Sequence, residues 1–243
     1  MKKSIFIIVI LFMCIHSYAQ VRLPRLISNG MVLQRDQAIN IWGWASANEH
    51  VQLTLDNEVY QTQANTNGDW SISIKAHTAG GPHTMNIKAS NEIHLNDILF
   101  GDVWVCSGQS NMELWMGRLK YKYADEITNA NNESIRQFLV PDQYDFKYPK
   151  KDMAAGEWLP VNSKNILDFS GVAYFFAKEI NAQYHIPIGI INSALGGSPA
   201  QAWISEEGLK AFPEYLVEAN KFKDDALIKQ IESGDQKISN AWY

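Results

Sequence analysis

The chain has 243 residues and a formal net charge of −5 at neutral pH, so it lacks the basic excess that a nucleic-acid-binding surface needs. Its length suits one large domain or two smaller ones. The eight tryptophans are candidates for stacking on sugar rings, although burial in a core is the more common role of this residue.

The first twenty residues have the layout of a secretory signal peptide. Lys2 and Lys3 precede an apolar stretch, Ile5–Ile15, and the segment closes on Ala19-Gln20, where we expect cleavage. The apolar stretch is too short to span a membrane comfortably. The sequence therefore predicts a secreted or periplasmic protein without stable membrane insertion after the signal is removed.

Residues 21–97 show the alternation of apolar and polar residues that is typical of half-buried strands. Turn residues separate these stretches, as at Asn67-Gly68-Asp69, and the spacing favours a small β-sandwich, jelly-roll-like module. The expected strands are Ile39–Trp44, Val51–Leu55, Trp70–Ile74 and His83–Ala89. The histidines of this module show no metal-ligand spacing, so no metal is predicted.

From residue 98 to residue 243 the pattern changes to strands that alternate with helices, which indicates a parallel α/β sheet. Strands are expected at Ile98–Cys106, Ile135–Val140 and Pro187–Asn192, and helices at Tyr123–Asn131, Gly171–Gln183 and Glu206–Tyr243. An apolar stripe on the middle helix is expected to pack on the sheet; its members are Phe169, Val172, Ala173, Phe176 and Ile180. After signal removal Cys106 is the one remaining cysteine, so no internal disulfide is predicted.

Two loops follow strands of this predicted sheet. Ser110 comes after the first strand, within Gly108-Gln-Ser-Asn111, and Gly196-Gly197 comes after the third. Because ligands bind beyond the carboxyl ends of parallel strands, both loops are expected at one rim. An exposed serine beside free backbone N–H groups indicates acyl transfer. Taken singly, each loop also fits an ordinary connection between a strand and a helix.

The blocks Gly101-Asp-Val-Trp104 and Gly108-Gln-Ser-Asn-Met112 together resemble the nucleophile block of sialate O-acetylesterases and related carbohydrate acetylesterases of the SGNH hydrolase superfamily. The second block of that family is similar to Gly189–Trp203, its characteristic helix to Gly171–Glu179, and the start of its β module to Arg25–Gln34. The resemblance covers nearly all of the chain beyond the signal. It implies a flavodoxin-like, three-layer α/β domain, here incomplete at its C-terminal end.

By this resemblance, Ser110 is the nucleophile that attacks an acetyl carbonyl of an O-acetylated sugar, and no cofactor is required. The N–H groups of Ser110 and Gly197 face the oxyanion, with Gly196 as a second candidate. The expected substrate contacts are Gln109, Asn111, Trp115 and Trp203.

A serine esterase also needs a general base, usually a histidine that a carboxylate orients. Four of the histidines after the signal precede Ser110, and His185 lies just before the third strand, on the opposite edge of the sheet. The family carries its third block and its Asp/His pair further toward the C-terminus. We therefore expect an N-terminal fragment of a longer enzyme, with little activity by itself.

Other readings stay open. The sugar could be acetylated xylan or another carbohydrate, because the loops that would select it are not recognisable in the sequence. A protein of another class, a non-catalytic carbohydrate-binding module built on the β strands and tryptophans, fits the composition as well. The oligomeric state is not predicted.

Overall fold

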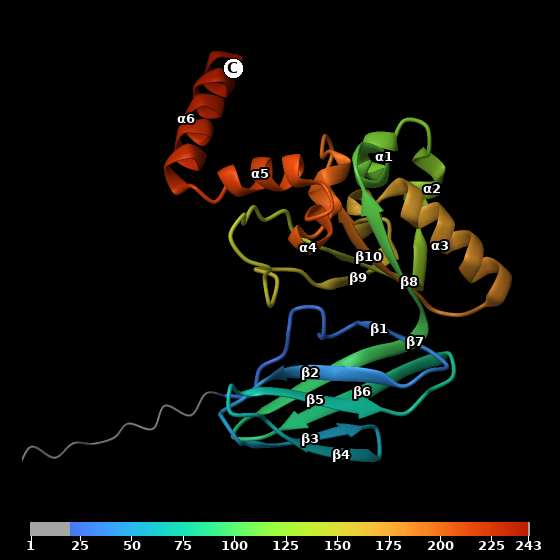
Figure 1. Ribbon diagram of the computed structural model, residues 1–243. Coiled ribbons are helices and arrows are strands. Elements are labelled where there is room, and N and C mark those ends of the chain that lie inside the picture. The colour runs from blue at the N-terminus through green and yellow to red at the C-terminus, as the bar shows by residue number, and fades with distance from the viewer. Residues whose placement is uncertain (1–19, 243) are drawn as a thin grey trace, which may run out of the picture.

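The computed structural model describes residues 20–242, and it places two parts one above the other (Figure 1). The all-β part holds β1 (Val32–Gln34), β2 (Ile39–Trp44), β3 (His50–Leu55), β4 (Glu58–Gln63), β5 (Asp69–Ile74) and β6 (Gly80–Lys88). The α/β part holds the strands β8 (Asn131–Leu139), β9 (Trp158–Asn162) and β10 (Ile188–Ala194). Strand β7 (Glu92–Gly108) runs through both parts.

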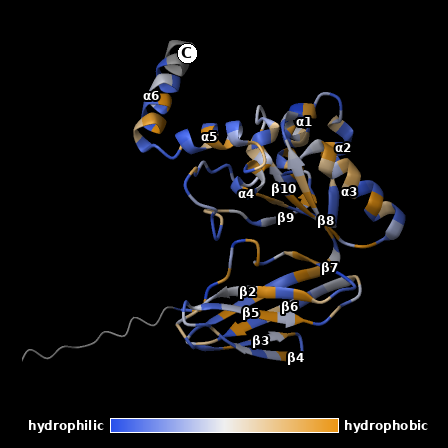
Figure 2. Cartoon of the chain, viewed as in Figure 1, coloured by the Kyte–Doolittle hydropathy of each residue, from blue (hydrophilic) through white to orange (hydrophobic). Residues whose placement is uncertain are grey.

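The helices belong to the α/β part and to the segment that follows it. They are α1 (Ser110–Glu113), α2 (Ala124–Thr128), α3 (Gly171–Tyr184), α4 (Glu206–Leu209), α5 (Pro213–Lys221) and α6 (Asp225–Trp242). Short 3-10 turns lie at Met116–Leu119, Asn165–Asp168 and Ala200–Trp203. In Figure 1, α5 and α6 extend away from the sheet, and Figure 2 shows that hydrophilic residues dominate both.

One large sheet links the two parts, in the strand order β4-β3-β6-β7-β10-β8-β9, with β1 also paired to β7. Strands β2 and β5 form a separate antiparallel pair. The boundary predicted between residues 97 and 98 falls within β7. The mixed α/β architecture agrees with the prediction, whereas the jelly-roll-like sandwich and the three-layer arrangement stay predictions.

The alternating pattern explains the strands of the all-β part. In β3, Val51, Leu53 and Leu55 are buried while the residues between them are partly exposed, and β5 repeats this pattern. Their side chains share one apolar core with residues of β6 and β7. The sequence did not predict β1 or β4. Strand β4 follows β3 after two residues, Asp56 and Asn57, which form a tight turn with Asp56 at a positive φ of 50°.

In the α/β part, β10 lies between β7 and β8 and is parallel to both, as the strand–helix alternation predicted. The helix predicted at 123–131 is shorter, because α2 ends at Thr128 and β8 begins at Asn131. Strand β9 lies in the stretch expected to be irregular and pairs antiparallel with β8. The tail predicted to be helical consists of α4, α5 and α6.

Helix α3 matches its predicted bounds, and Ser170 caps its start by accepting a hydrogen bond from the Ala173 N–H. The predicted apolar stripe is wrong in part, because Val172 and Phe176 are exposed. The face that packs on the sheet carries Ala173, Tyr174 and Ala177 instead. The helix is therefore rotated about its axis relative to the prediction. The ring of Phe176 contacts the ring of Trp104 in an edge-to-face arrangement, with ring centroids 5.0 Å apart.

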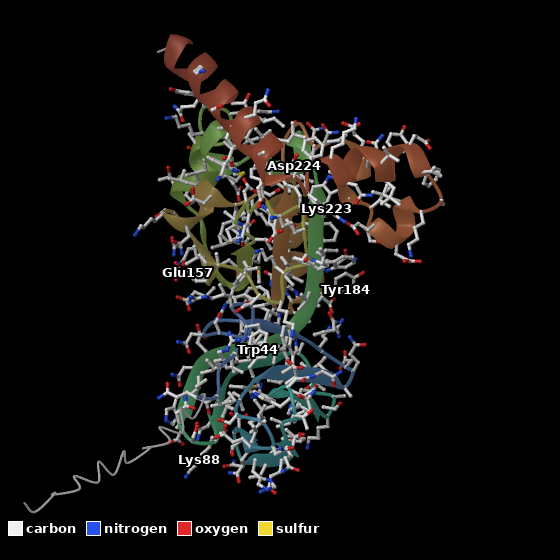
Figure 3. The ribbon with its side chains drawn as sticks, turned by 60° about the vertical axis from the view of Figure 1, so that its left-hand side comes forward. Trp44, Lys88, Glu157, Tyr184, Lys223 and Asp224 are labelled. Carbon is white, nitrogen blue, oxygen red and sulfur yellow. The ribbon has the colours of Figure 1, made fainter. Side chains whose placement is uncertain are left out.

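Arg136 of β8 ties the two parts together. Its side chain is 3% exposed and donates to the carbonyl oxygens of Gly30 and Asp97, at 2.8 and 2.6 Å, and to the Asp97 carboxylate at 2.9 Å. Trp158 of β9 adds a second link, because its indole N–H donates to the Leu26 carbonyl at 2.8 Å. Figure 3 labels Trp44 in the all-β part and Glu157 in the α/β part, near the junction of the two parts.

The predicted signal peptide, residues 1–20, lies outside the described residues except for Gln20 and stays a prediction. Within residues 20–242, no helix is both long enough and apolar enough to cross a membrane.

Candidate active site

Ser110 stands at the point where β7 turns into α1. The strand ends at Gly108, whose φ of +148° suits glycine and few other residues, and Gln109 then caps the helix. The N–H groups of Met112 and Glu113 donate to the Gln109 carbonyl at 2.9 and 3.0 Å, which closes the turn. Ser110 is therefore the first residue of α1, and its side chain is exposed at the carboxyl rim of the sheet.

The loop after β10 lies beside this turn. Residues Ser193 and Ala194 pair in register with Ser107 and Gly108, so the two strands end at the same level. The Leu195 N–H then donates to the Gly108 carbonyl at 3.0 Å. A methyl group placed on Gly196 would lie 3.5 Å from the Ser110 Oγ. The hydroxyl and the diglycine backbone are thus neighbours, as the shared rim predicted.

The two glycine amides of this loop differ. The Gly196 N–H donates to the Glu113 Oε2 at 2.7 Å. Gly197 is exposed, with a φ of +78° that places it in the left-handed region. Ser198 closes the turn, because its hydroxyl donates to the Leu195 carbonyl at 2.6 Å and accepts from the Trp203 indole at 2.9 Å. Gly197 is the better of the two oxyanion candidates, since the Gly196 amide already has an acceptor.

The predicted substrate contacts lie at the same rim. Gln109 and Asn111 are exposed on either side of Ser110, and Trp115 and Trp203 are 42% and 43% exposed. Trp115 lines a cavity of about 290 Å³ whose other walls come from β8, β9 and the 3-10 turn before α3. Glu157, Asn165 and Asp168 are among the residues that line this cavity. The roles assigned to these residues stay predictions.

Among the described residues, no histidine lies at this rim. His77 and His83 pack against Phe100 in the all-β part, and His83 contacts the Asp56 carboxylate at 2.7 Å. His50 and His94 belong to β3 and β7 of the same part. His185 is the left-handed residue that ends α3, three residues before β10 begins, so it lies at the opposite end of that strand.

Other reactive groups are few in the described part of the chain. Cys106 is buried, and burial raises the pKa of its thiol, which disfavours the nucleophilic thiolate. Residues 20–242 contain no group of three or more His, Cys, Asp or Glu side chains that could hold a metal ion. Among the described residues, the Ser110 hydroxyl lies at the rim beside the diglycine loop.

These features define a class of protein: a mixed α/β protein with an SGNH-like sheet whose carboxyl rim carries a serine turn and a diglycine turn. Comparison with known proteins gives the family. Residues 100–233 match the family model described as carbohydrate esterase, sialic acid-specific acetylesterase. This match spans more than half of the chain. The chain belongs to this family of sialic acid-specific acetylesterases.

Individual relatives agree with this assignment. The chain is 30% identical over 210 residues to the sialate O-acetylesterases of Pongo abelii and Homo sapiens, and each match covers 78% of this chain. A crystal structure of a carbohydrate acetylesterase from Xanthomonas citri superposes with a TM-score of 0.74 and 37% identity, covering 78% of this chain and 43% of that one. The chain spans 40% of the length of those two curated relatives.

Proposed function

We propose that this chain carries the nucleophile and the oxyanion hole of a serine esterase that removes O-acetyl groups from sialic acid or a related sugar. The observation that carries the proposal is the exposed Ser110 hydroxyl beside the diglycine backbone. A methyl group built on Gly196 would lie 3.5 Å from the Ser110 Oγ. Family membership supports the same chemistry.

In this proposal the Ser110 Oγ attacks the acetyl carbonyl carbon and gives its proton to a general base. Negative charge that develops on the carbonyl oxygen is held by the N–H groups of Ser110 and Gly197. Collapse of the tetrahedral intermediate breaks the bond to the sugar oxygen, which takes the proton from the general base to become a hydroxyl, and leaves acetyl-Ser110. Water then attacks this ester, releasing acetate and restoring the serine.

The sugar is proposed to lie over the rim, where Gln109 and Asn111 donate or accept hydrogen bonds. Trp115 and Trp203 offer half-exposed aromatic faces on which a sugar ring can stack. An acetylated neutral carbohydrate is the second candidate substrate. The specific observation in its favour is the cavity beside Trp115, because Glu157 and Asp168 would repel the carboxylate of a sialic acid bound there.

The general base is proposed to come from outside the described residues, since no described histidine lies at the rim. We therefore expect residues 20–242 to hydrolyse acetyl esters only slowly when no general base is supplied. Export to the periplasm or the medium, inferred from residues 1–20, is part of the same proposal.

Chemical rescue tests the proposal. Imidazole in solution can replace a missing histidine, so we expect added imidazole to speed acetate release from an aryl acetate and from an O-acetylated sialoside. The Ser110→Ala variant should show only the rate of imidazole alone. Ser107→Ala is the matched control, because Ser107 is another exposed serine on the same strand end and should leave the rate unchanged. Equal rates in Ser110→Ala and the unmodified chain would disprove the role of Ser110.

A further inference from the structure

Glu113 connects the two loops of the candidate site through a contact that no sequence pattern predicts. It is the last residue of α1 and lies three residues after Ser110 on the same short helix. Its Oε2 accepts the hydrogen bond from the Gly196 N–H at 2.7 Å, across 83 residues of sequence. Glu113 itself is partly buried, whereas Gly196 and the hydrogen bond that joins them are exposed.

The fit around this contact is tight. A methyl group on Gly196 would lie 2.3 Å from the Glu113 Oε2, well inside van der Waals contact. The same methyl position is 3.5 Å from the Ser110 Oγ. Any side chain at position 196 would therefore displace the carboxylate, and the carboxylate, the Gly196 peptide and the serine hydroxyl form one packed group.

We propose that Glu113 is a positioning residue that holds the diglycine loop at a fixed place relative to Ser110. The role rests on the proposed function, because it concerns the oxyanion donors of that reaction. By fixing the Gly196 N–H, the carboxylate limits the positions that the next peptide, which carries the Gly197 N–H, can take. Glu113 thereby takes the Gly196 amide out of the oxyanion hole and places the Gly197 amide in it.

Two physical reasons favour a hydrogen bond from the diglycine loop to Glu113. Gly196 and Gly197 are both exposed, and successive glycines leave a loop many accessible conformations. A hydrogen bond from an amide to a carboxylate is about twice as strong as one between neutral groups. A displacement of about 1 Å in a catalytic group can lower the rate roughly 100-fold. A contact that holds the loop in place therefore protects the rate.

The test compares four variants of the full chain in the imidazole-supported assay. Glu113→Ala removes the acceptor, and Gly196→Ala displaces it. We expect each to lower kcat by roughly 10- to 100-fold with little change in KM, because the oxyanion forms after the substrate binds. The double variant should be no slower than either single one, since both remove the same contact. Glu113→Gln keeps an oxygen acceptor and should restore most of the rate.

One further measurement, with one control variant, separates positioning from a general loss of structure. The amide signal of Gly196 in a nitrogen–proton correlation spectrum should move in Glu113→Ala and stay close to its original position in Glu113→Gln. Glu179→Ala, which removes an exposed glutamate of α3, is the control and should change neither the rate nor this signal.

The outcomes are distinct. An unchanged kcat in Glu113→Ala, or equal losses in Glu113→Ala and Glu113→Gln, would overturn the positioning role while leaving Ser110 as the nucleophile. Losses that multiply in the double variant would overturn it as well. If the unmodified chain itself shows no Ser110-dependent rate, the proposed function fails first and the positioning role falls with it.

Discussion

The two halves of β7 are one continuous strand in opposite surroundings. Residues 92–101 pair with β6 and, near their end, with β1, and the side chains of Ile98 and Phe100 are fully buried. Residues 102–108 pair with β10 on one edge, and among the described residues no strand pairs with the other edge. There Trp104 and Val105 are 43% and 69% exposed.

This difference separates stability from function along a single strand. The first half is fixed by pairing with β6, by pairing with β1 at residues 99–101, and by a closed apolar core. The second half carries the Ser110 turn to the rim, and among the described residues one of its two hydrogen-bonding edges has no partner strand. Open edges of this kind can accept a further strand. Because residues 92–101 are held in the core, residues 102–108 can present a polar, glycine-bearing turn that is open to solvent.

The largest effect expected from this comparison concerns the apolar side chains of the two halves. Phe100→Ala should lower the free energy of unfolding by about 4 kcal/mol, since it removes a fully buried ring from the core. Val105→Ala, only five residues later, should change it by less than about 0.5 kcal/mol. Urea unfolding of both variants measures the contrast. Similar losses in the two variants would mean that the face of β7 that carries Val105 is covered in solution.

A second prediction tests whether the two parts unfold together. Arg136→Met keeps much of the side-chain volume but leaves the Gly30 and Asp97 carbonyls without their buried donor. We expect a loss of about 3 kcal/mol, as is typical when one partner of a buried charged network is removed. Fluorescence and circular dichroism should still report one transition. Two separate transitions in the variant would show that Arg136 is what couples the parts.

Much of the fold could be predicted because the local pattern and the tertiary structure agree. Strict alternation marks β2 and β5, and a continuous apolar run marks the buried middle of β7. Strand β9 was not predicted, since it contains Pro160 and is defined by its pairing with β8 rather than by its own pattern. The central place of β10 depends on how the crossover connections run, which no local pattern encodes.

For the candidate site, the sequence predicts that the Ser110 and Gly196 turns share a rim, because both follow parallel strands. It could not predict the contact of Glu113 with the Gly196 amide, which depends on the register between β7 and β10 and on the direction of one helical turn. Likewise the exposure of Val172 and Phe176 reflects the rotation of α3 against the sheet, and a periodic stripe leaves that rotation undetermined within one or two positions.

The smallest effect expected concerns the core that the second half of β7 enters, where Cys106 packs with α3 and with Tyr174. Burial raises the pKa of Tyr174, and the hydrogen bond that its hydroxyl donates to Glu126 raises it further. The neutral tyrosine favours the folded state, so its contribution is complete below about pH 10, the value for an unfolded chain. As the pH rises further the unfolded chain ionises first, and stability falls by up to about 1.4 kcal/mol per pH unit.

Tyr174→Phe should therefore remove part of the alkaline loss of stability, which urea unfolding at about pH 9 and about pH 11 would measure. Tyr184→Phe is the matched control, because Tyr184 ends the same helix but is 57% exposed, and it should leave the slope unchanged. An alkaline slope that is the same in Tyr174→Phe and the unmodified chain would show that this core admits water at Tyr174. The face of the sheet that α3 covers would then be accessible to water in solution.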